Sequence, residues 1–403
     1  MPSPSEELQQ LQTQGLLRGL KPLDSPTGPQ VTRDGRTLWN FASNDYLGLA
    51  RHPRIEAALI EGVRRFGAGA AASRLVCGTL PPHVLLEEAL AEAKTTEAAL
   101  VFSSGFATAL GVIPAIAGKA DFILLDKLSH ACLVDAARLS GATLRVFPHN
   151  DLSKLARLLA ATRAKAPTAR ILVATESVFS MDGDLCPLRE IVTLVEAHAA
   201  LLLLDEAHAF GVLGESGMGL AEQEHLQQRV TFQMGTLSKA AGLAGGYLAA
   251  SREWIDLLTN RARSFIYSTA PPPALAHAAH AALRLIRSPE GRALRTRLRH
   301  HISLIDNSPT PIIPKILGTN DAALTASAAL AAAGFMVPAI RFPTVPRGTA
   351  RLRISLSAAH PPEAVAALAA ALGSILPDTP PLQPISSAMF ARPAFRDGLK
   401  NLP

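Results

Sequence analysis

The sequence contains few cysteines, and this scarcity excludes two classes of small stabilised domain. Only 3 of the 403 residues are cysteines, and they lie far apart at Cys77, Cys132 and Cys186. An odd number of distant cysteines forms neither a disulfide framework nor the paired spacing of a zinc site. We therefore expect no metal and a reducing, cytoplasmic compartment.

Signals for export or membrane insertion are also lacking. Residues 1–7 do not combine a basic with an apolar region, as a signal peptide does. Two stretches without charge, 98–118 and 322–340, have the length of a membrane span. Ser103-Ser104-Gly105 and Pro114 interrupt the first stretch, and the second is rich in alanine. Both suit buried elements better, so we expect no membrane segment.

No basic block accompanies the net charge of +6, because the lysines and arginines are scattered along the chain. Scattered charge attracts phosphorylated ligands weakly and does not form the basic stripe of nucleic-acid-binding proteins. We expect no nucleic-acid partner. With 48% hydrophobic residues over 403 positions, the chain can form two domains with a large core.

Short apolar runs alternate with helical stretches through the first two thirds of the chain. Such runs are typical of strands buried in a parallel sheet. The alternation predicts an α/β protein with a large, doubly wound, mainly parallel sheet, whose ligand lies beyond the carboxyl ends of the strands. The expected strands are 99–102, 122–125, 144–147, 171–175, 201–204 and 230–233.

The pattern changes near residue 270, where Pro271-Pro272-Pro273 precedes a predicted long helix over 274–301. Strands at 312–313 and 351–356 then indicate a smaller α+β domain, and another helix is expected over 6–17. The predicted segments are a lead-in over 1–45, a large α/β domain over 46–270, a linker helix with a small α+β domain over 271–376, and an irregular tail over 377–403.

One lysine, Lys239, lies among small and apolar residues between Gly235 and Gly242. A desolvated lysine loses part of its proton affinity, so its amine can act as a nucleophile or hold a Schiff base. An ordinary solvated lysine is the alternative. The apolar run 201–204 leads directly into Asp205. A buried acid near a reactive lysine is the arrangement used with pyridoxal phosphate, where a carboxylate pairs the pyridinium nitrogen.

Three other polar residues, His130, Ser180 and His208, also follow predicted strands, so we expect them to converge with Asp205. A histidine can stack on a flat cofactor or bind its oxygen, although a surface position is the alternative. Residues 103–108 read as a turn that opens a helix, whose amides and dipole can bind an anion.

Two further segments are candidates for ligand contact. The glycine-rich loop over 67–74 allows close approach of backbone to a ligand, and a tightly packed structural loop is an equal alternative. Arg351 and Arg353 alternate along one predicted strand, and we expect their side chains to face opposite sides. One guanidinium would then bind a substrate carboxylate while the other faces water, with two solvated arginines as the alternative.

Seven segments form an ordered set of motifs: 43–49, 104–106, 129–130, 176–183, 205–208, 236–239 and 267–269. Together they resemble the α-oxoamine synthases, which are pyridoxal 5'-phosphate enzymes of the aspartate-aminotransferase fold, also called fold type I. The resemblance covers about residues 15–375. It implies a homodimer with active sites at the subunit interface.

The resemblance implies a role for each matching position around the cofactor ring. Lys239 would bind the cofactor covalently and then serve as the general base. Asp205 would pair the pyridinium nitrogen, and His130 would stack on the ring. His208 and Ser180 would contact the side of the ring that carries the phenolic oxygen.

The same resemblance implies the residues that hold the cofactor phosphate. The amides of Gly105 and Phe106 and the hydroxyl of Thr236 would bind it from one subunit. Ser268 and Thr269 would reach in from the second subunit.

For the substrates, the segments 15–18, 147–151 and 343–353 most resemble the branch of the family that condenses L-alanine with pimeloyl-CoA or a pimeloyl-carrier protein in biotin biosynthesis. Asn44 and Arg353 would hold the amino-acid carboxylate beside His130, while Arg18 and Thr349 would help to bind the acyl thioester.

Two alternatives remain at this stage. A sister enzyme that uses glycine or serine, such as 5-aminolevulinate synthase or 2-amino-3-ketobutyrate CoA ligase, would share every cofactor residue. A non-catalytic protein could also keep the fold, but the intact Lys239, Asp205 and His130 argue against it. Ala70, Ala71 and Ala72 depart from the glycine or serine usual in the family and would narrow the acyl channel.

Overall fold

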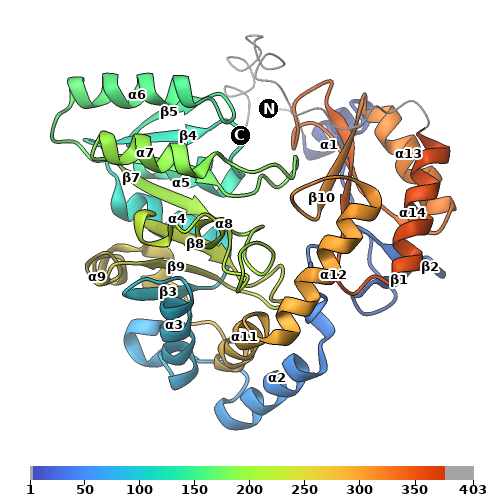
Figure 1. Cartoon of the computed structure of the whole chain (residues 1–403), viewed down its shortest axis with the longest axis horizontal. Coiled ribbons are helices and arrows are strands. Elements are labelled where there is room, and N and C mark those ends of the chain that lie inside the picture. The colour runs from blue at the N-terminus through green and yellow to red at the C-terminus, as the bar shows by residue number, and fades with distance from the viewer. Residues whose placement is uncertain (1–2, 377–403) are drawn as a thin grey trace.

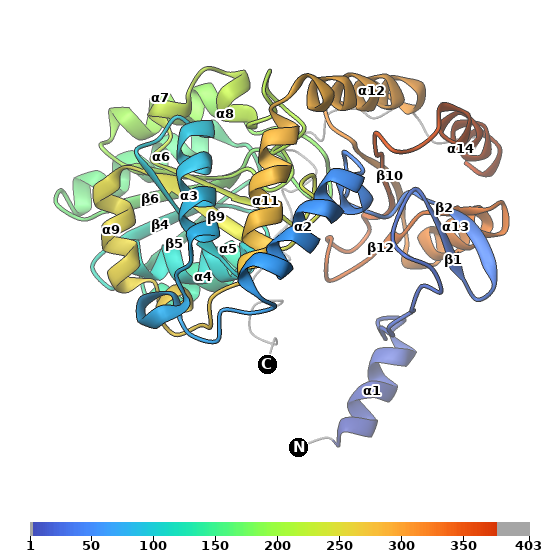
Figure 2. The same ribbon diagram turned by 90° about the horizontal axis from the view of Figure 1, so that it is seen from below.

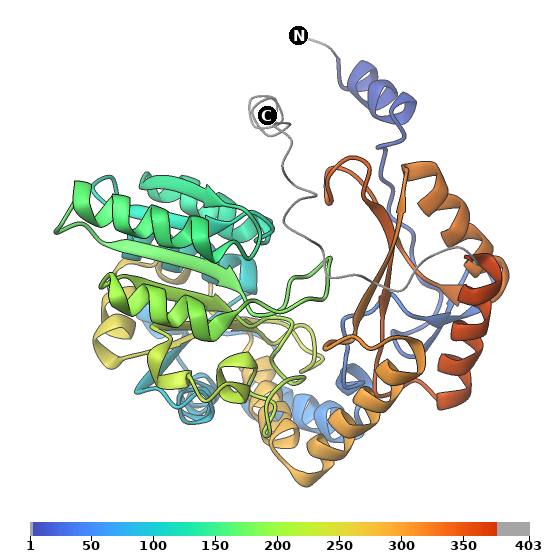
Figure 3. The same ribbon diagram turned by 45° about the horizontal axis from the view of Figure 1, so that its top comes forward.

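The computed structural model describes residues 3–376, which form a large lobe around a seven-stranded sheet and a smaller lobe with two three-stranded sheets (Figure 1). Strands β1 (Gln30–Arg33) and β2 (Arg36–Asn40) from the start of the chain lie within the smaller lobe, among its C-terminal elements (Figure 3). The predicted tail over 377–403 lies outside the described residues. The predicted domain limits stay a prediction.

The large sheet has the strand order β3-β9-β8-β7-β6-β4-β5, in which only β9 runs antiparallel to its neighbours. The predicted mainly parallel sheet is therefore confirmed. Strand β9 was not predicted, and β8 begins later than the expected residue 230. The strands are β3 (Ala98–Phe102), β4 (Phe122–Asp126), β5 (Thr143–Phe147), β6 (Ile171–Glu176), β7 (Leu201–Asp205), β8 (Phe232–Thr236) and β9 (Gly246–Ala250).

Helices cover both faces of this sheet (Figure 2). Because successive strand residues point to opposite faces, Leu203 packs into one apolar core with α4, α5 and α9. Leu202 and Leu204 pack into the other core with α3, α6, α7 and α11 (Pro273–Ile286). The helices are α3 (Pro81–Ala93), α4 (Gly105–Ile116), α5 (Ala131–Ser140), α6 (Leu152–Lys165), α7 (Leu188–Ala197), α8 (Leu220–Gln223), α9 (Arg252–Arg261) and α10 (Arg263–Ile266).

The smaller lobe is built from segments near both ends of the described chain. Strand β2 pairs in parallel with β11, where Trp39 is the register partner of Phe335, and a second sheet has the order β10-β13-β12. Its remaining elements are β10 (Ile312–Gly318), α13 (Asn320–Ala332), β11 (Phe335–Met336), β12 (Ala339–Ile340), β13 (Ala350–Ser355) and α14 (Pro362–Ile375).

The helix predicted over 274–301 is wrong in extent, because two helices, α11 (Pro273–Ile286) and α12 (Pro289–Ile305), occupy this region. Proline lacks an amide hydrogen and disfavours helical backbone at the preceding residue, so Pro289 ends one helix and begins the next. Helix α2 (Pro53–Phe66) packs along α11.

Helix α1 (Pro4–Thr13) is shorter than the predicted 6–17 and projects from the lobes in Figure 2. It ends just before Gly15, whose φ of 64° is outside the helical range. Within residues 3–376, no helix is both long and apolar enough to span a bilayer. The cytoplasmic location stays a prediction.

Candidate active site

Lys239 lies in the connection between β8 and β9, at the edge of the large sheet where the parallel strands end. Leu237 and Ala240 are buried, the intervening Ser238 is exposed, and Lys239 itself is half-buried. Its Nζ lies 2.7 Å from Nε2 of His208. Desolvation lowers the pKa of Lys239 to about 8, although the nearby Asp205 carboxylate opposes the shift. The amine is therefore easier to deprotonate than that of a solvated lysine.

His208 connects Lys239 to a row of hydrogen bonds that fixes its tautomer. The Tyr46 hydroxyl donates to Oδ1 of Asn44 at 3.2 Å, so its oxygen can accept from Nδ1 of His208 at 2.7 Å. Nε2 of His208 is then left to accept a hydrogen bond from Lys239. Burial lowers the pKa of His208 well below its ordinary value. A neutral His208 is thus the acceptor that faces the lysine.

Two carboxylates lie side by side near this lysine. Asp205 at the end of β7 is the register partner of Glu176 at the end of β6, and both are buried. The amide of Ala207 donates to Oδ1 of Asp205 at 2.9 Å. Burial raises the pKa of Asp205, while the charge of Lys239 opposes the rise. Burial and the neighbouring Asp205 raise the pKa of Glu176 well above its ordinary value.

His130 lies at the start of α5 and stays exposed. Its amide donates to Oε1 of Glu176, and its Nδ1 accepts from the amide of Cys132 at 3.2 Å. These two contacts fix the position of the ring beside the carboxylates, with a face open to a flat ligand. Sequence reasoning did not select Glu176 as a site residue, although it ends a buried strand as Asp205 does.

A cradle for an anion forms at the start of α4. The hydroxyl of Ser104 accepts from the Ala107 amide at 3.0 Å, whereas the first amides of a helix, here those of Gly105 and Phe106, have no partner within the helix. A Cβ on Gly105 would lie 3.5 Å from Cβ of Thr236 and would fill the space between them. The Thr236 hydroxyl donates to the Gly245 carbonyl at 2.8 Å and lies 2.8 Å from the exposed hydroxyl of Ser238. Helix amides and hydroxyls in this arrangement suit a phosphate.

Arg351 and Arg353 both face the loop after β6, so the prediction that they face opposite sides is wrong. Residues two apart share one face of a strand. Arg351 donates to Oδ1 of Asp182 at 2.5 Å, and Nε of Arg353 donates to the Ser180 carbonyl at 2.6 Å. One of the two arginines was expected to face water, but both are buried.

Arg353 also contacts the row of hydrogen bonds that leads to Lys239. Its two terminal nitrogens donate to Oδ1 of Asn44 at 3.2 Å and to the Ser355 hydroxyl at 2.7 Å. These contacts and the Ser180 carbonyl use three of the five guanidinium hydrogens. Tyr46 is a further hydrogen-bond neighbour of this guanidinium, and a planar group with several donors is suited to binding a carboxylate.

Arg18, Thr349, Ser268 and Thr269 are not brought to Lys239 by any contact within residues 3–376. Arg18 donates to the Thr344 hydroxyl at 3.2 Å, and Thr349 donates to the Pro346 carbonyl at 2.7 Å, so both lie along the exposed loop after β12. Thr269 forms an isolated bridge with Ser73 of the glycine-rich loop.

His149 was not selected from the sequence, but it joins two loops of the site. Its Nδ1 lies 3.1 Å from Oδ1 of Asp126 and its Nε2 lies 2.7 Å from Oδ2 of Asp184. Burial alone would lower the pKa of His149, but hydrogen bonds to the two carboxylates outweigh it and raise the pKa to about 10. The charged ring therefore ties the loop that precedes His130 to the loop that follows Ser180.

The donor set fits pyridoxal phosphate. It offers an anion cradle at α4, an exposed imidazole face at His130, a buried acid at Asp205 and a desolvated amine at Lys239. Within residues 3–376, no three His, Cys, Asp or Glu side chains are grouped to hold a metal ion.

Comparison with known proteins gives relatives along nearly the whole chain. Residues 36–372 match the family model described as aminotransferase class I and II. Proteins named 8-amino-7-oxononanoate synthase from Geobacter sulfurreducens and Anaeromyxobacter sp. (strain K) are 49% and 48% identical. The first alignment covers 88% of this chain and 93% of the relative, and the second covers 94% and 96%.

Solved structures share the fold. A serine palmitoyltransferase from S. paucimobilis with a bound PLP-myriocin aldimine has a TM-score of 0.85 and 28% identity, over 92% of this chain and 97% of that one. An 8-amino-7-oxononanoate synthase from Francisella tularensis has a TM-score of 0.71 and 26% identity, over 84% and 96%.

Proposed function

Because the chain belongs to the aminotransferase class I and II family, we propose that it is a pyridoxal-phosphate-dependent acyltransferase with 8-amino-7-oxononanoate synthase activity. It condenses L-alanine with pimeloyl-CoA or a pimeloyl-carrier protein and releases 8-amino-7-oxononanoate, carbon dioxide and the thiol. The observation that carries this proposal is a desolvated lysine beside a buried acid in a chain that is 48% identical to such a synthase over 94% of its length.

The cofactor, when bound, supplies an aldehyde carbon that joins the amino group and a ring that accepts an electron pair. Lys239 is the group that would hold it, with Asp205 at the ring nitrogen and His130 on the ring face. The α4 amides of Gly105 and Phe106, with the Thr236 hydroxyl, would hold the phosphate. Glycine at position 105 supports this role, because a side chain there would occupy the cradle.

Lys239 is the base that takes the Cα proton of alanine. A pKa of about 8 supports this role, because a base works best when its pKa is close to the working pH. His208 accepts a hydrogen bond from the same Nζ, which orients the amine, and Tyr46 keeps His208 in the required tautomer. The neutral imidazole also avoids adding a second positive charge beside the lysine.

The alanine carboxylate binds to the Arg353 guanidinium. Contacts with Ser180, Asn44 and Ser355 fix the orientation of the guanidinium, so little rotamer freedom is lost when the carboxylate binds. Loss of that carboxylate as carbon dioxide after condensation gives the amino ketone.

The acyl thioester lies along the exposed loop that carries Thr349, with Arg18 beside it. The lead-in segment supports this position, because Arg341 donates to the Gly15 carbonyl at 2.5 Å and Arg18 contacts Thr344. Arg18 has no ion-pair partner among the described residues and is available for an anionic carrier group.

The enzyme works as a homodimer in which Ser268 and Thr269 of one subunit complete the phosphate site of the other. Exposed apolar residues around these positions support this assembly, since Val76 is 79% exposed and Tyr267 is 71% exposed. Large apolar side chains grouped on a surface are typical of a protein interface.

Thiol release by the purified, cofactor-loaded protein tests the proposed function. Pimeloyl-CoA is supplied with L-alanine, glycine or L-serine in parallel, and pimeloyl-carrier protein replaces the CoA ester in a second series. We expect release with L-alanine, with 8-amino-7-oxononanoate identified by mass. Release only with glycine or serine would move the protein to a sister activity.

A serine-using synthase is the second candidate, because solved serine palmitoyltransferases superpose with TM-scores of 0.85 and 0.86. Palmitoyl-CoA with L-serine is therefore included. Faster release with this pair than with pimeloyl-CoA and L-alanine would favour the second candidate.

A further inference from the structure

The turn that follows β6, residues 178–185, is closed by its own backbone contacts. Val178 and Leu185 form an isolated bridge across its two ends. The Phe179 amide donates to the Asp184 carbonyl at 3.1 Å. Because these contacts join the two arms of the turn, a contact that holds one arm also restrains the other.

The smaller lobe contacts this turn through the two arginines of β13. Nε of Arg353 donates to the Ser180 carbonyl at 2.6 Å, and Arg351 donates to Oδ1 of Asp182 at 2.5 Å. A guanidinium is planar, so the acceptor of its Nε helps to set the plane in which the other nitrogens lie. The position of the turn therefore sets the orientation of the Arg353 guanidinium.

On the side of the large lobe, His149 holds the turn. Its Nε2 lies 2.7 Å from Oδ2 of Asp184, and its ring packs edge-on against Phe179 with the ring centroids 4.3 Å apart. Its Nδ1 lies 3.1 Å from Oδ1 of Asp126 at the end of β4. Both nitrogens face carboxylate oxygens, so both donate and the ring is charged. Hydrogen bonds between charged groups are stronger than neutral ones, so this is a firm link between β4 and the turn.

Asn150 supports the same link. Its amide donates to Oδ2 of Asp126 at 2.9 Å, and its side-chain nitrogen donates to the Leu185 carbonyl at 3.1 Å. Its φ of 54° lies in the left-handed region, which asparagine adopts more readily than most residues. With this backbone conformation, His149 and Asn150 both reach the turn.

A buried charged histidine is not needed for stability alone. Desolvation of the charges opposes their attraction, and well-packed apolar side chains often stabilise a fold equally. The directional hydrogen bonds of His149 add a fixed distance between β4 and the turn, which apolar packing would not define as closely.

We propose that His149 is a positioning residue for the amino-acid substrate. It holds the turn 178–185 against the large lobe, which carries Lys239 and the cofactor site. Through the Ser180 carbonyl, the turn then keeps the Arg353 guanidinium where the substrate carboxylate binds. The identity of the substrate rests on the proposed function, whereas the link between His149 and the turn does not.

Absorbance titration of the cofactor-loaded full chain with L-alanine and with ethylamine tests the proposal. Ethylamine keeps the amine and the methyl group of alanine but lacks the carboxylate. His149→Gln removes the charge and one of the two donors. We expect at least about tenfold weaker L-alanine binding and less than about twofold weaker ethylamine binding. A general loss of stability would weaken both ligands alike.

Asp184→Ala breaks the link at the turn and leaves the pair of His149 with Asp126 in place. The same selective loss of L-alanine affinity is expected. The double variant should bind L-alanine within about twofold of His149→Gln, because both changes remove one interaction. Losses that simply add would show that the two residues act independently and would overturn the proposal.

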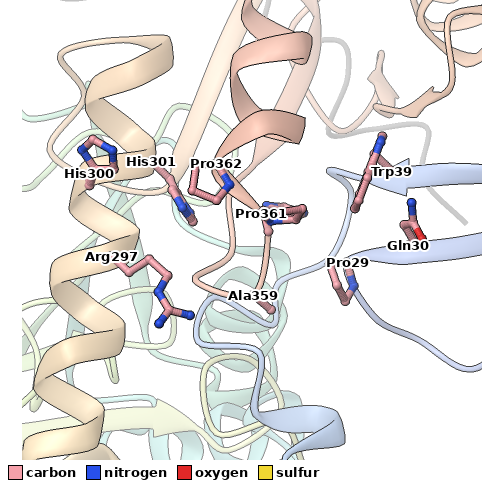
Figure 4. Close-up of a pocket in the computed structure, with 10 residues that line it drawn as sticks. Pro29, Gln30, Trp39, Arg297, His300, His301, Ala359, Pro361 and Pro362 are labelled. Carbon is pink, nitrogen blue, oxygen red and sulfur yellow. The ribbon is translucent and has the colours of Figure 1, made fainter.

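His301→Gln is the matched control, because His301 is also a buried histidine. It lies on α12 and lines a pocket near the start of α14 that includes no residue of the turn (Figure 4). Its Nδ1 lies 3.0 Å from the Ser357 carbonyl, to which a glutamine nitrogen can donate. The ratio of L-alanine to ethylamine affinity should be unchanged in this variant.

Hydrogen exchange of the backbone amides over 177–186 separates this inference from the proposed function, because it needs no substrate. We expect faster exchange in His149→Gln and Asp184→Ala than in His301→Gln. Unchanged exchange, unchanged L-alanine affinity or an equal loss for L-alanine and ethylamine would each overturn the proposal. If the unsubstituted protein binds no amino acid, the proposed function fails, and the exchange rates still decide whether His149 holds the turn.

Discussion

Lys94 and Lys239 both lie near the end of β7, but they differ in burial and in whether a carboxylate contacts the amine. Asp205 and Glu206 are consecutive, and Glu206 forms a fully buried ion pair with Lys94. Lys94 also donates to the Met218 carbonyl at 2.6 Å. Lys239 has no carboxylate within ion-pair distance among the described residues, and a neutral His208 is its hydrogen-bond partner.

The difference separates a structural from a chemical use of the same side chain. A buried lysine with a carboxylate in contact keeps its proton and holds two elements together. A desolvated lysine without that contact binds its proton less tightly and becomes reactive. Four predictions test this contrast.

The largest effect is expected for Lys239→Ala. Loss of the amine removes both the hold on the cofactor and the base, so turnover should fall at least about 10⁴-fold. Thiol release and the visible absorbance of the bound cofactor measure the two losses. Turnover within tenfold of the unchanged enzyme would assign the base to another group.

Lys94→Met should lower the free energy of unfolding by about 3–5 kcal/mol, because Glu206 is left buried and charged without its partner. Urea unfolding measures the change. Adding Glu206→Gln keeps an oxygen that accepts from Ala221 and should recover part of the loss. Arg65→Met is the control, because its ion pair with Glu61 is exposed and should contribute little to the free energy of unfolding. An equal loss in the two single variants would contradict the contrast.

Asp205→Asn should lower turnover by about 10²–10³-fold while the fold is kept, because a charge that is aligned for the reaction is lost. Glu206→Gln is the matched variant one residue later. It should lower the unfolding temperature but leave the turnover of folded protein nearly unchanged. The contrast fails if the two variants lose turnover equally.

Lys239→Met should stabilise the cofactor-free protein at pH 7 by about 1–3 kcal/mol, opposite in sign to Lys94→Met. The pKa of Lys239 is about 8 in the fold and about 10.4 in an unfolded chain, so the unfolded chain binds more protons between these values. The stability of the unsubstituted protein should therefore rise with pH across this window, and the advantage of the variant should vanish above it. Thermal unfolding at pH 7 and at the highest pH that both proteins tolerate measures this; an advantage independent of pH would contradict it.

Six of the seven strands of the large sheet were predicted near their observed positions, whereas β9 and the short strands β1, β2, β11 and β12 were not predicted. Asp205 and His208 were identified because each lies within a few residues of the end of an apolar run, and in a parallel sheet those ends meet. Only the sheet topology is needed for that inference. Lys239 was identified because it is the one charged residue in a segment of small and apolar residues.

Contacts between distant segments could not be predicted in this way. Tyr46 lies 162 positions from His208, and no local pattern indicates that the two side chains meet. The pair between Arg351 and Asp182 likewise joins distant segments, so it could not be predicted. Because of this pair, Arg351 is buried, although it was expected to face water. These contacts depend on how the smaller lobe closes on the large sheet.

The pairing of β2 with β11 also sets the order in which the protein can form. The partner of Trp39 is Phe335, and the amide of Ser355 donates to the Phe41 carbonyl. Residues near 40 can therefore form these contacts only after residues 335–355 have been synthesised. A ribosome adds about 5–20 residues each second, and the large sheet can assemble during that interval. Asn44 and Tyr46 meet Arg353 only when synthesis is almost complete, so a truncated nascent chain would hold a folded large lobe without a working enzyme.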